Sequence, residues 1–528
     1  MDIQGWIESL GSSLNKEQIK PIVGIAAATT VALYTTYALR KKRDAIPEGF
    51  RDIPTVSEGR IPYFGHLLSM GELPATTITK WHKKYGPIIR VYFGVQPWIM
   101  ISDPNIAHEL FSTKGSVTSG RPWQLYSHQY YAPGQRGVAF PDPGKRWKKT
   151  RTAALDILAP KNVDKFSDII SRESEYLIKY LTSASFANGS VSLIKPLQFF
   201  SMNVILQASL GKRVDSPHDP EFREIVRVID QSMKFAGVAE DISSFLPILT
   251  VLDVVYRKER KLKRFIEEVR NPLFRRLIKE SLDSGEECLA KWFYEYKDEE
   301  VDDHGILVAL SDIVAGGADT TAVSLSWFMV IMCHHPEVQE RLRAEVDEFL
   351  LANKRFPTFA DRDSFPYLIS VQKECIRYRP TTHFGLLHQA TADVDVQGYY
   401  IPKGTVMVSN MHAMHLNPDA FSNPEEFIPE RFLNNLKPMS ASANSGIDNR
   451  DQYNFGWGRR ICPGIYLAET EMFYALTRLF AKAIIEPKMD ADGKLVYPDL
   501  KKTHDAGLVV HPEIDELRLV ERTDAVIF

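Results

Sequence analysis

One cysteine in a stretch rich in glycine and arginine is the feature of this sequence best suited to chemistry. The stretch Phe455–Gly464 reads FGWGRRICPG, and a run of apolar residues at helical spacing follows it. Gly458 and Gly464 allow the backbone to turn tightly and to approach a flat cofactor. Pro463 suits the first turn of the following helix, whose free N–H groups favour a thiolate at Cys462. A single thiolate is too few for structural zinc but can ligate a haem iron; a buried core cysteine is the alternative.

A second unusual stretch lies inside a segment that reads as one long buried helix, Asp302–Cys333. Its middle contains Gly316 and Gly317, followed by Asp319 and Thr320. Each glycine destabilises a helix by about 1 kcal/mol relative to alanine, so the presence of two adjacent glycines here requires an explanation. Glycines let a helix approach a flat ring, and the Thr320 hydroxyl can bond to the carbonyl of Gly316, four residues back, which opens a groove. A kink that serves only packing is the alternative.

Charged and aromatic residues recur elsewhere at helical spacing. Glu374 and Arg377 are three residues apart, and Trp147 and Arg151 are four apart, so each pair shares one helix face. A further arginine, Arg431, lies in the sequence Pro-Glu-Arg-Phe.

Together, in this order, these motifs resemble those of the cytochrome P450 superfamily. Phe455–Gly464 matches the haem-binding signature Phe-x-x-Gly-x-Arg-x-Cys-x-Gly at every fixed position. The resemblance covers roughly residues 40–528 and implies the cytochrome P450 fold, mainly α with small β-sheets. It implies haem b with Cys462 as the axial ligand. The haem contacts that it implies come from Trp147, Arg151, Gly316, Gly317, His388, Phe455, Arg460 and Gly464. His388 stands where the family often has an arginine that binds a haem propionate.

The same resemblance assigns roles to the other motifs. It makes Thr320 and Asp319 the pair that activates dioxygen and relays protons. It joins Glu374, Arg377 and Arg431 in a buried ion triad that fixes the thiolate loop. Loss of any member of this triad should prevent haem incorporation, because an unpaired buried charge costs several kcal/mol.

The implied function is a haem-thiolate monooxygenase like the fungal microsomal members of the family. Such an enzyme hydroxylates or epoxidises a sizeable apolar molecule, for example a steroid, a terpenoid or a foreign compound. No flavin or dinucleotide domain is visible, so the two electrons are expected from a separate NADPH-dependent reductase, with a cytochrome b-type donor as a further candidate. Two alternatives remain open: a haem-thiolate isomerase or dehydratase that uses no dioxygen, and a haem-binding protein without enzymatic activity.

Composition excludes several other classes. The chain has 528 residues and a net charge of −3, which does not suggest a nucleic-acid-binding protein. No linker-like segment or internal repeat divides it, so one catalytic domain is expected. The four cysteines are far apart in sequence, which argues against a disulfide framework or a zinc ribbon and favours a cytosol-facing protein: Cys288, Cys333, Cys375 and Cys462.

The amino-terminal region predicts a membrane anchor. Ile22–Leu39 carries no charge, and four basic residues follow it. As a helix it would be roughly 27 Å long, enough for a thin bilayer, and the basic cluster places the rest of the chain in the cytosol. A cleaved signal peptide is the alternative. We therefore expect a short luminal segment (1–21), a single transmembrane helix (22–39) in the endoplasmic reticulum membrane, a basic and proline-containing tether (40–62) and the catalytic domain (63–528).

Other segments give weaker predictions. Ile88–Phe93 and Trp98–Ile101 read as two strands around a turn. Thr382–Leu387 is expected to be a strand beside the substrate, and Tyr400–Gly404 a hairpin turn. The segments expected to choose the substrate are the aromatic loop 119–143, a loop-like apolar stretch at 236–253, residues 382–388 and residues 504–510.

A local basic patch precedes and includes the Trp147 helix. Its members are Lys145, Arg146, Lys148 and Lys149. The patch is either a solvated helix face or a docking surface for an acidic electron donor, because such charge mainly steers the encounter of two proteins.

Overall fold

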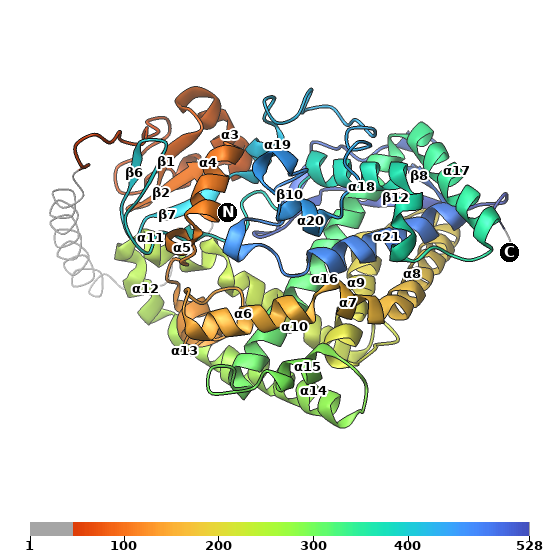
Figure 1. Ribbon diagram of the computed structural model, residues 1–528, viewed down its shortest axis with the longest axis horizontal. Helices are drawn as coiled ribbons and strands as arrows, with labels where there is room; N and C mark the ends of the chain where they lie inside the picture. Colours follow the sequence, from red (N-terminus) through yellow and green to blue (C-terminus); the bar gives the residue numbers. More distant parts are fainter. Residues whose placement is uncertain (1–45, 527–528) are drawn as a thin grey trace.

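The structure is a computed structural model that describes residues 46–526. A long helix, α16 (Asp303–Cys333), runs through the middle of the molecule (Figure 1). Asp302 caps its first turn by accepting a hydrogen bond from the Gly305 N–H. The predicted helix at Asp302–Cys333 is thus confirmed. Within residues 46–526, α16 is also the one helix long and apolar enough to cross a membrane, but most of it is buried inside the protein.

Other helices surround α16 and make up most of the molecule (Figure 1). In chain order they are α3 (Pro74–Tyr85), α4 (Pro104–His108), α5 (Gly115–Thr118), α6 (Lys145–Ile157), α7 (Pro160–Val163), α8 (Ser167–Asn188), α9 (Ile194–Leu210), α10 (Pro220–Ala236), α11 (Ile242–Phe245), α12 (Thr250–Val255), α13 (Lys258–Arg264), α14 (Asn271–Asp283), α15 (Leu289–Glu295), α17 (Pro336–Asn353), α18 (Pro366–Tyr378), α19 (Met411–His415), α20 (Met439–Ala443) and α21 (Ile465–Lys482). Helical turns of π type are η2 (Glu109–Thr113), η3 (Leu125–Tyr131) and η7 (Phe265–Arg270). The 3-10 turns are η1 (Leu67–Ser69), η4 (Asp164–Phe166), η5 (Val238–Asp241), η6 (Pro247–Leu249), η8 (Phe359–Ser364), η9 (Ile447–Asn449) and η10 (Gly458–Arg460).

The strands form small sheets. One has the order β1-β2-β7-β4, and a second has the order β3-β12-β8-β9. β10 pairs with β11 and β5 with β6. The strands are β1 (Ile88–Phe93), β2 (Gln96–Ile101), β3 (Val191–Ser192), β4 (His388–Gln389), β5 (Val394–Val396), β6 (Tyr399–Ile401), β7 (Val406–Ser409), β8 (Ala483–Met489), β9 (Leu495–Val496), β10 (Thr503–Asp505), β11 (Val510–Pro512) and β12 (Glu516–Glu521). The predicted first hairpin is confirmed, with Phe93 opposite Gln96 and Ile88 opposite Ile101.

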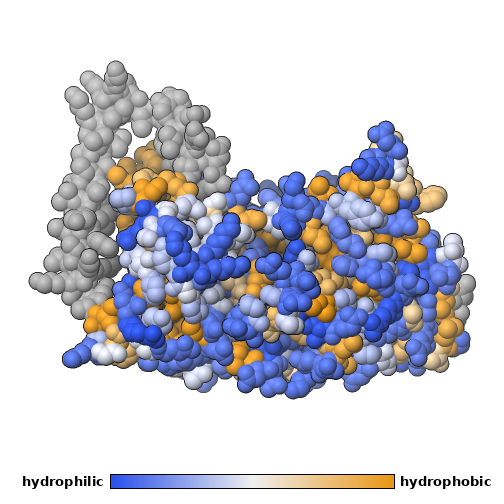
Figure 2. Space-filling model, turned by 90° about the horizontal axis from the view of Figure 1, so that it is seen from above, coloured by the Kyte–Doolittle hydropathy of each residue, from blue (hydrophilic) through white to orange (hydrophobic). Residues whose placement is uncertain are grey.

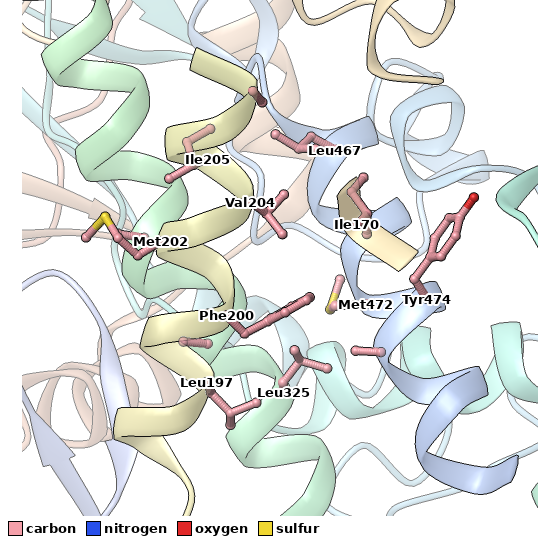
Figure 3. Packing of buried hydrophobic residues seen from close by; sticks show 14 of the residues in the cluster. Ile170, Leu197, Phe200, Met202, Val204, Ile205, Leu325, Leu467, Met472 and Tyr474 are labelled. Atoms are coloured by element: carbon pink, nitrogen blue, oxygen red, sulfur yellow. The ribbon is translucent and has the colours of Figure 1, made fainter. Parts of the chain in front are cut away.

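The main hydrophobic core lies where α8, α9, α16 and α21 meet. Phe200 of α9, Leu325 of α16 and Met472 of α21 point toward one another, and Ile170 of α8 lies beside them (Figure 3). Each of these side chains is almost fully buried. A side chain of this size gains about 1.5–3 kcal/mol from burial, so the contact holds α16 and α21 in fixed positions.

Three predictions about local structure were wrong. Residues 236–253 are not a loop but a chain of short helices, and they pack through Phe245 on Trp98 of the amino-terminal sheet. Thr382–Leu387 is irregular, and the strand begins only at His388. Tyr400–Gly404 is not a hairpin turn, because it leads from β6 to β7, which belong to different sheets. In each case the apolar run is short, and tertiary contacts decide its conformation.

The basic patch on α6 is largely neutralised by the acidic segment 298–300. Lys145 forms an ion pair with Glu300 at 2.9 Å, and Lys149 pairs with Asp298. Arg146 also lies 3.7 Å from Glu300. The docking surface proposed from sequence therefore carries far less free charge than the composition of the patch suggests.

The predicted luminal segment and transmembrane helix, and the first part of the tether, lie outside the described residues. The described chain begins at Ile46 with apolar side chains on the surface, including Phe50, Phe64 and Leu68. Figure 2 shows apolar side chains among hydrophilic ones at this end of the molecule.

Candidate functional site

The stretch that contains Cys462 folds as a tight loop. The Cys462 N–H donates a hydrogen bond to the Phe455 carbonyl at 2.8 Å, which closes the loop. Gly458 has a φ of +47°, and a Cβ there would lie 2.3 Å from the Phe111 carbonyl oxygen. No other residue fits this position, because both the backbone angle and the space require glycine. Gly458 thus behaves as the sequence predicts.

The helix that follows the cysteine starts later than expected. α21 begins at Ile465 with Gly464 as its N-cap, so Pro463 lies outside its first turn. Gly464 has an ordinary φ of −93° and does not need the freedom of glycine. Burial raises the pKa of the Cys462 thiol, although the Gly464 N–H and Arg151 act in the opposite direction. The Gly464 N–H and Arg151 are therefore the groups that would stabilise a thiolate at this position.

Cys462 opens into a cavity that the middle of α16 also lines. Thr320 lines this cavity, and its Oγ1 donates a hydrogen bond to the Gly316 carbonyl at 2.8 Å, which is the predicted bond. Gly316 has open space where a Cβ would be. At Gly317, a Cβ would lie 2.9 Å from Cγ1 of Ile205. Gly316 thus leaves room in the cavity, whereas Gly317 allows α9 to approach α16 closely.

Asp319 points away from this cavity. Its Oδ1 accepts a hydrogen bond from the Gln198 side-chain N–H at 2.9 Å, and Asp319 is not among the residues that line the cavity. Asp319 and Thr320 are adjacent in a helix, so their side chains diverge by about 100°. The two members of the predicted proton relay therefore point in different directions from α16.

Three buried arginines crowd one edge of the cavity. They are Arg121, Arg151 and Arg460, and burial together with mutual repulsion lowers the pKa of Arg460 to about 8 and that of Arg121 to about 9. Asp142 is the carboxylate that acts on this cluster. The buried Nε of Arg151 has no hydrogen-bond partner. Buried charges need partners, so the cluster fits a ligand that brings negative charge, such as the two propionates of haem.

Trp147 and His388 each place one ring nitrogen against a backbone carbonyl. The Trp147 indole N–H donates to the Val138 carbonyl at 3.1 Å, and its ring lies 4.2 Å from the Arg460 guanidinium carbon. His388 Nδ1 lies 2.9 Å from the Thr118 carbonyl, so Nδ1 carries the proton. Burial lowers the pKa of His388 to about 3, and in its neutral form the other nitrogen can only accept a hydrogen bond. Trp147 therefore stacks on Arg460, and the Nδ1 proton of His388 is directed at the Thr118 carbonyl.

Glu374, Arg377 and Arg431 meet in one buried ion cluster behind the Cys462 loop. Arg377 donates to both oxygens of Glu374 at 2.7 and 2.8 Å, and the Nε of Arg431 donates to Oε2 at 3.0 Å. Arg377 also donates to the carbonyls of His415 and Pro424. None of the three lines the cavity, which is consistent with a structural role.

The predicted substrate segments contribute unequally to the cavity. Val138 of the aromatic loop, Phe384 of residues 382–388 and Val509 of residues 504–510 line it. None of the described side chains between residues 236 and 253 does so. Trp123, the first aromatic residue of the loop, is 60% exposed and faces solvent.

Some residues of the site carry no signal that we recognised in the sequence. Arg121 lies in an irregular loop without a motif. Asp312 of α16 accepts hydrogen bonds from the N–H groups of Val138 and Ala139 at 2.7 and 3.1 Å, and it thereby fixes the aromatic loop. Glu471 of α21 lines the cavity and is almost fully buried, although its helix also carries other charged residues that gave it no distinct signal.

Comparison with known proteins identifies the family. A family model for cytochrome P450 matches residues 54–510. The chain belongs to the cytochrome P450 family. Its P450 relatives include cytochrome P450 1A1 of Limanda limanda, 27% identical over 479 residues, with 87% of this chain and 89% of the relative covered. Cytochrome P450 monooxygenase 58 of Postia placenta is 25% identical, with 99% of this chain and 97% of the relative covered.

Solved P450 structures share the fold. A zebra fish cytochrome P450 structure with abiraterone superposes with a TM-score of 0.69 at 25% identity and covers 85% of this chain and 100% of its own. A zebra fish P450 structure with progesterone superposes with a TM-score of 0.71 at 24% identity. The chain is thus a P450 monooxygenase, and the thiol, the cavity and the arginine cluster fit the thiolate-ligated haem of this family.

Replacing Glu471 by glutamine should remove a pH dependence of stability. Burial raises the pKa of Glu471 from its usual 4.5 to about 8, so the folded state binds more protons than the unfolded state between these values. The contribution of neutral Glu471 is complete below pH 4.5 and is lost as the pH rises through about 8. Relative to Glu471→Gln, the wild type should lose up to about 1.4 kcal/mol per pH unit in this window.

Urea unfolding of both proteins at several pH values between about 5 and 8 measures this difference. A difference in unfolding free energy that stays constant across the window would contradict the assignment. The nearby buried Glu469, whose pKa is raised to about 7, titrates in both proteins and so cancels in the comparison.

Proposed function

We propose that this P450 is a membrane-anchored monooxygenase that inserts one oxygen atom of dioxygen into a sizeable apolar substrate. The observation that carries the proposal is that Cys462 and Thr320, with its hydrogen bond to the Gly316 carbonyl, line the same cavity. A thiolate ligand and a hydroxyl in one cavity suit oxygen activation. An isomerase or dehydratase would not need this hydroxyl.

The bound haem supplies the redox chemistry, and the thiolate favours cleavage of the O–O bond. Cys462 would hold the iron. Arg121, Arg151 and Arg460 would bind the propionates, since their guanidinium groups gather at one edge of the cavity. Thr320 would hold a proton at Oγ1 on the substrate side. Asp319 would supply protons from its position beside Gln198.

An apolar substrate is supported by the residues beside Thr320. Ile313, Phe384, Leu386 and Val509 line the cavity together with Ile205. Such a surface favours a sizeable apolar molecule oriented by few polar groups. A steroid is our first candidate, and the likeness to the zebra fish P450 solved with abiraterone supports it.

The membrane part of the proposal rests on residues 22–39 and on exposed apolar side chains. In addition to Phe50, Phe64 and Leu68, Val254 of α12 is 75% exposed. Tyr63 accepts a hydrogen bond from the Ile248 N–H at 2.9 Å, which joins the two segments at one end of the molecule. We infer that this end rests on the endoplasmic reticulum membrane, with the catalytic domain in the cytosol and a separate NADPH-dependent reductase as electron donor.

Thr320→Ala tests the proposed chemistry. Without the hydroxyl, protons are no longer held beside the reacting oxygen, so NADPH consumption should continue while peroxide is released. Product formed per NADPH should fall roughly tenfold or more. Product, peroxide and NADPH are measured together with the purified reductase.

Ser311→Ala is the matched control. The Ser311 hydroxyl makes the same type of bond to Leu307, four residues back on α16 at 2.8 Å, but it does not line the cavity. Thr320→Ser should restore coupling. Full coupling in Thr320→Ala would overturn the role of Thr320, and product formation without NADPH and oxygen would favour the isomerase alternative.

A further inference from the structure

A groove with a volume of about 460 Å³ lies between α9 and α10. It shares no lining residue with the Cys462 cavity. Its volume is within the range of roughly 300–1,000 Å³ that is typical of small-molecule sites. The groove is therefore large enough to hold a small molecule of its own.

Four basic side chains from two helices border this groove. They are Lys195 of α9 and Arg223, Arg227 and Lys234 of α10, and all four are exposed. Arg223 and Arg227 are four residues apart, so they share one face of α10. Asp230 is the one acidic residue that lines the groove. The groove thus concentrates positive charge in a chain whose net charge is −3.

The two arginines have no partner of opposite charge. Within residues 46–526, neither guanidinium group forms an ion pair or a hydrogen bond. Glu221 and Glu224 of the same helix instead pair with Arg276 of α14, at 2.6 and 2.9 Å. The acidic residues of α10 are thus engaged by α14, while its arginines border the groove.

The two lysines are closer to negative charge than the arginines are. Burial raises the pKa of Asp230, and the Lys195 ammonium acts in the opposite direction, so these two groups interact. Lys234 lies 3.9 Å from a carboxylate oxygen of Glu240. The free positive charge of the groove therefore comes mainly from the two arginines.

Apolar side chains also line the groove, among them Pro217, Phe222 and Val226. Phe222 is only 7% exposed, and its ring packs edge-to-face on Phe199 of α9 at a centroid distance of 5.1 Å. This surface is therefore held in place by the core. An inorganic anion would leave it in contact with water, whereas a ligand with an apolar body would cover it.

We propose that the α9–α10 groove binds a free amphiphilic anion, that is, an apolar molecule with one carboxylate or sulfate group. Arg223 and Arg227 bind the oxyanion, because guanidinium groups match its geometry with paired hydrogen bonds. The apolar body covers Phe222 and Val226. A merely solvated helix face would need neither cations from two helices nor an apolar lining. The site is separate from the Cys462 cavity and does not depend on the proposed reaction.

Photo-crosslinking of the full-length, haem-loaded protein in phosphatidylcholine nanodiscs tests this site. The probe is decanoate with a diazirine at the end of its chain, and mass spectrometry locates the adducts. Adducts should form within residues 217–234, and an azole that ligates the haem iron should not reduce them. In Arg223→Glu/Arg227→Glu, labelling at a low probe concentration should fall at least about tenfold, because charge-assisted hydrogen bonds are lost. Haem absorbance checks the fold, and Arg223→Gln/Arg227→Gln repeats the test without charge reversal.

Arg260→Glu/Arg264→Glu is the matched control. These arginines of α13 are also exposed and four residues apart, so the net charge changes equally, and labelling of the groove should persist. Decanol with the same diazirine should label the groove far less, and Val226→Trp should lower labelling by filling it. Equal labelling by decanol, or undiminished labelling in both variants of Arg223 and Arg227, overturns the site. Labelling only by an anionic lipid of the nanodisc that carries the diazirine overturns a free ligand.

Discussion

Cys462→Ser should yield a protein without the red-shifted carbon monoxide band and without detectable product. A serine hydroxyl does not provide the thiolate whose electron density favours O–O cleavage. No other described cysteine can replace it, because Cys288, Cys333 and Cys375 are buried elsewhere in the core. The spectrum of the reduced protein under carbon monoxide and a product assay with reductase measure the two effects.

The matched control is Cys288→Ser. The sulfur of Cys288 is buried, and it lies 3.0 Å from the Ser281 hydroxyl, so an oxygen fits there as well. This variant should keep both the band and the activity. A red-shifted band in Cys462→Ser would exclude Cys462 as the ligand.

Much of the frame of the site could be predicted, because it depends on local patterns. The long apolar segment Asp302–Cys333 predicted α16, and the spacing of Thr320 from Gly316 predicted their hydrogen bond. The three-residue spacing of Glu374 and Arg377 predicted a shared helix face, where the structure has a two-bond ion pair. Each of these features can be predicted from helix geometry within a single segment of the chain.

The contents of the site were harder to predict, because they depend on partners distant in sequence. Asp319 reads as a residue of the cavity, but its carboxylate bonds to Gln198 of α9 and does not line the cavity. The Thr118 carbonyl fixes the protonated nitrogen of His388. Arg121 becomes part of the cavity only because the aromatic loop folds back over α16. There Asp312 accepts hydrogen bonds from two backbone N–H groups of this loop. No spacing within a single segment contains this information.

The conformation of short apolar segments was also hard to predict from the sequence. Residues 236–253 lack a helical period, yet they form short helices, because the Val95 N–H donates to the Phe245 carbonyl at 2.9 Å and the sheet shapes the segment. The described side chains of this segment pack on the amino-terminal sheet and do not line the cavity. Substrate choice should therefore depend on Phe384, Leu386 and Val509.

Arg377→Leu should destabilise the ion cluster behind the Cys462 loop and prevent haem incorporation. Glu374 and Arg377 are fully buried, and the change would leave Glu374 with Arg431 as its remaining charge partner. It would also remove the hydrogen bonds to the carbonyls of His415 and Pro424. Breaking a buried ion pair from one side costs roughly 3–5 kcal/mol, which is a large part of the stability of a typical domain. Haem absorbance per protein and urea unfolding measure the loss.

An exposed ion pair provides the control. Arg264 and Glu268 lie 3.5 Å apart on the surface, with side chains 60% and 67% exposed, so Arg264→Leu should cost less than about 1 kcal/mol. The loss of unfolding free energy in Arg431→Leu should lie between those of Arg264→Leu and Arg377→Leu, because the two bonds between Arg377 and Glu374 remain. This order follows from the number of charge-assisted bonds that each change removes from Glu374. If Arg377→Leu bound haem and unfolded like Arg264→Leu, the ion cluster would not be what positions the Cys462 loop.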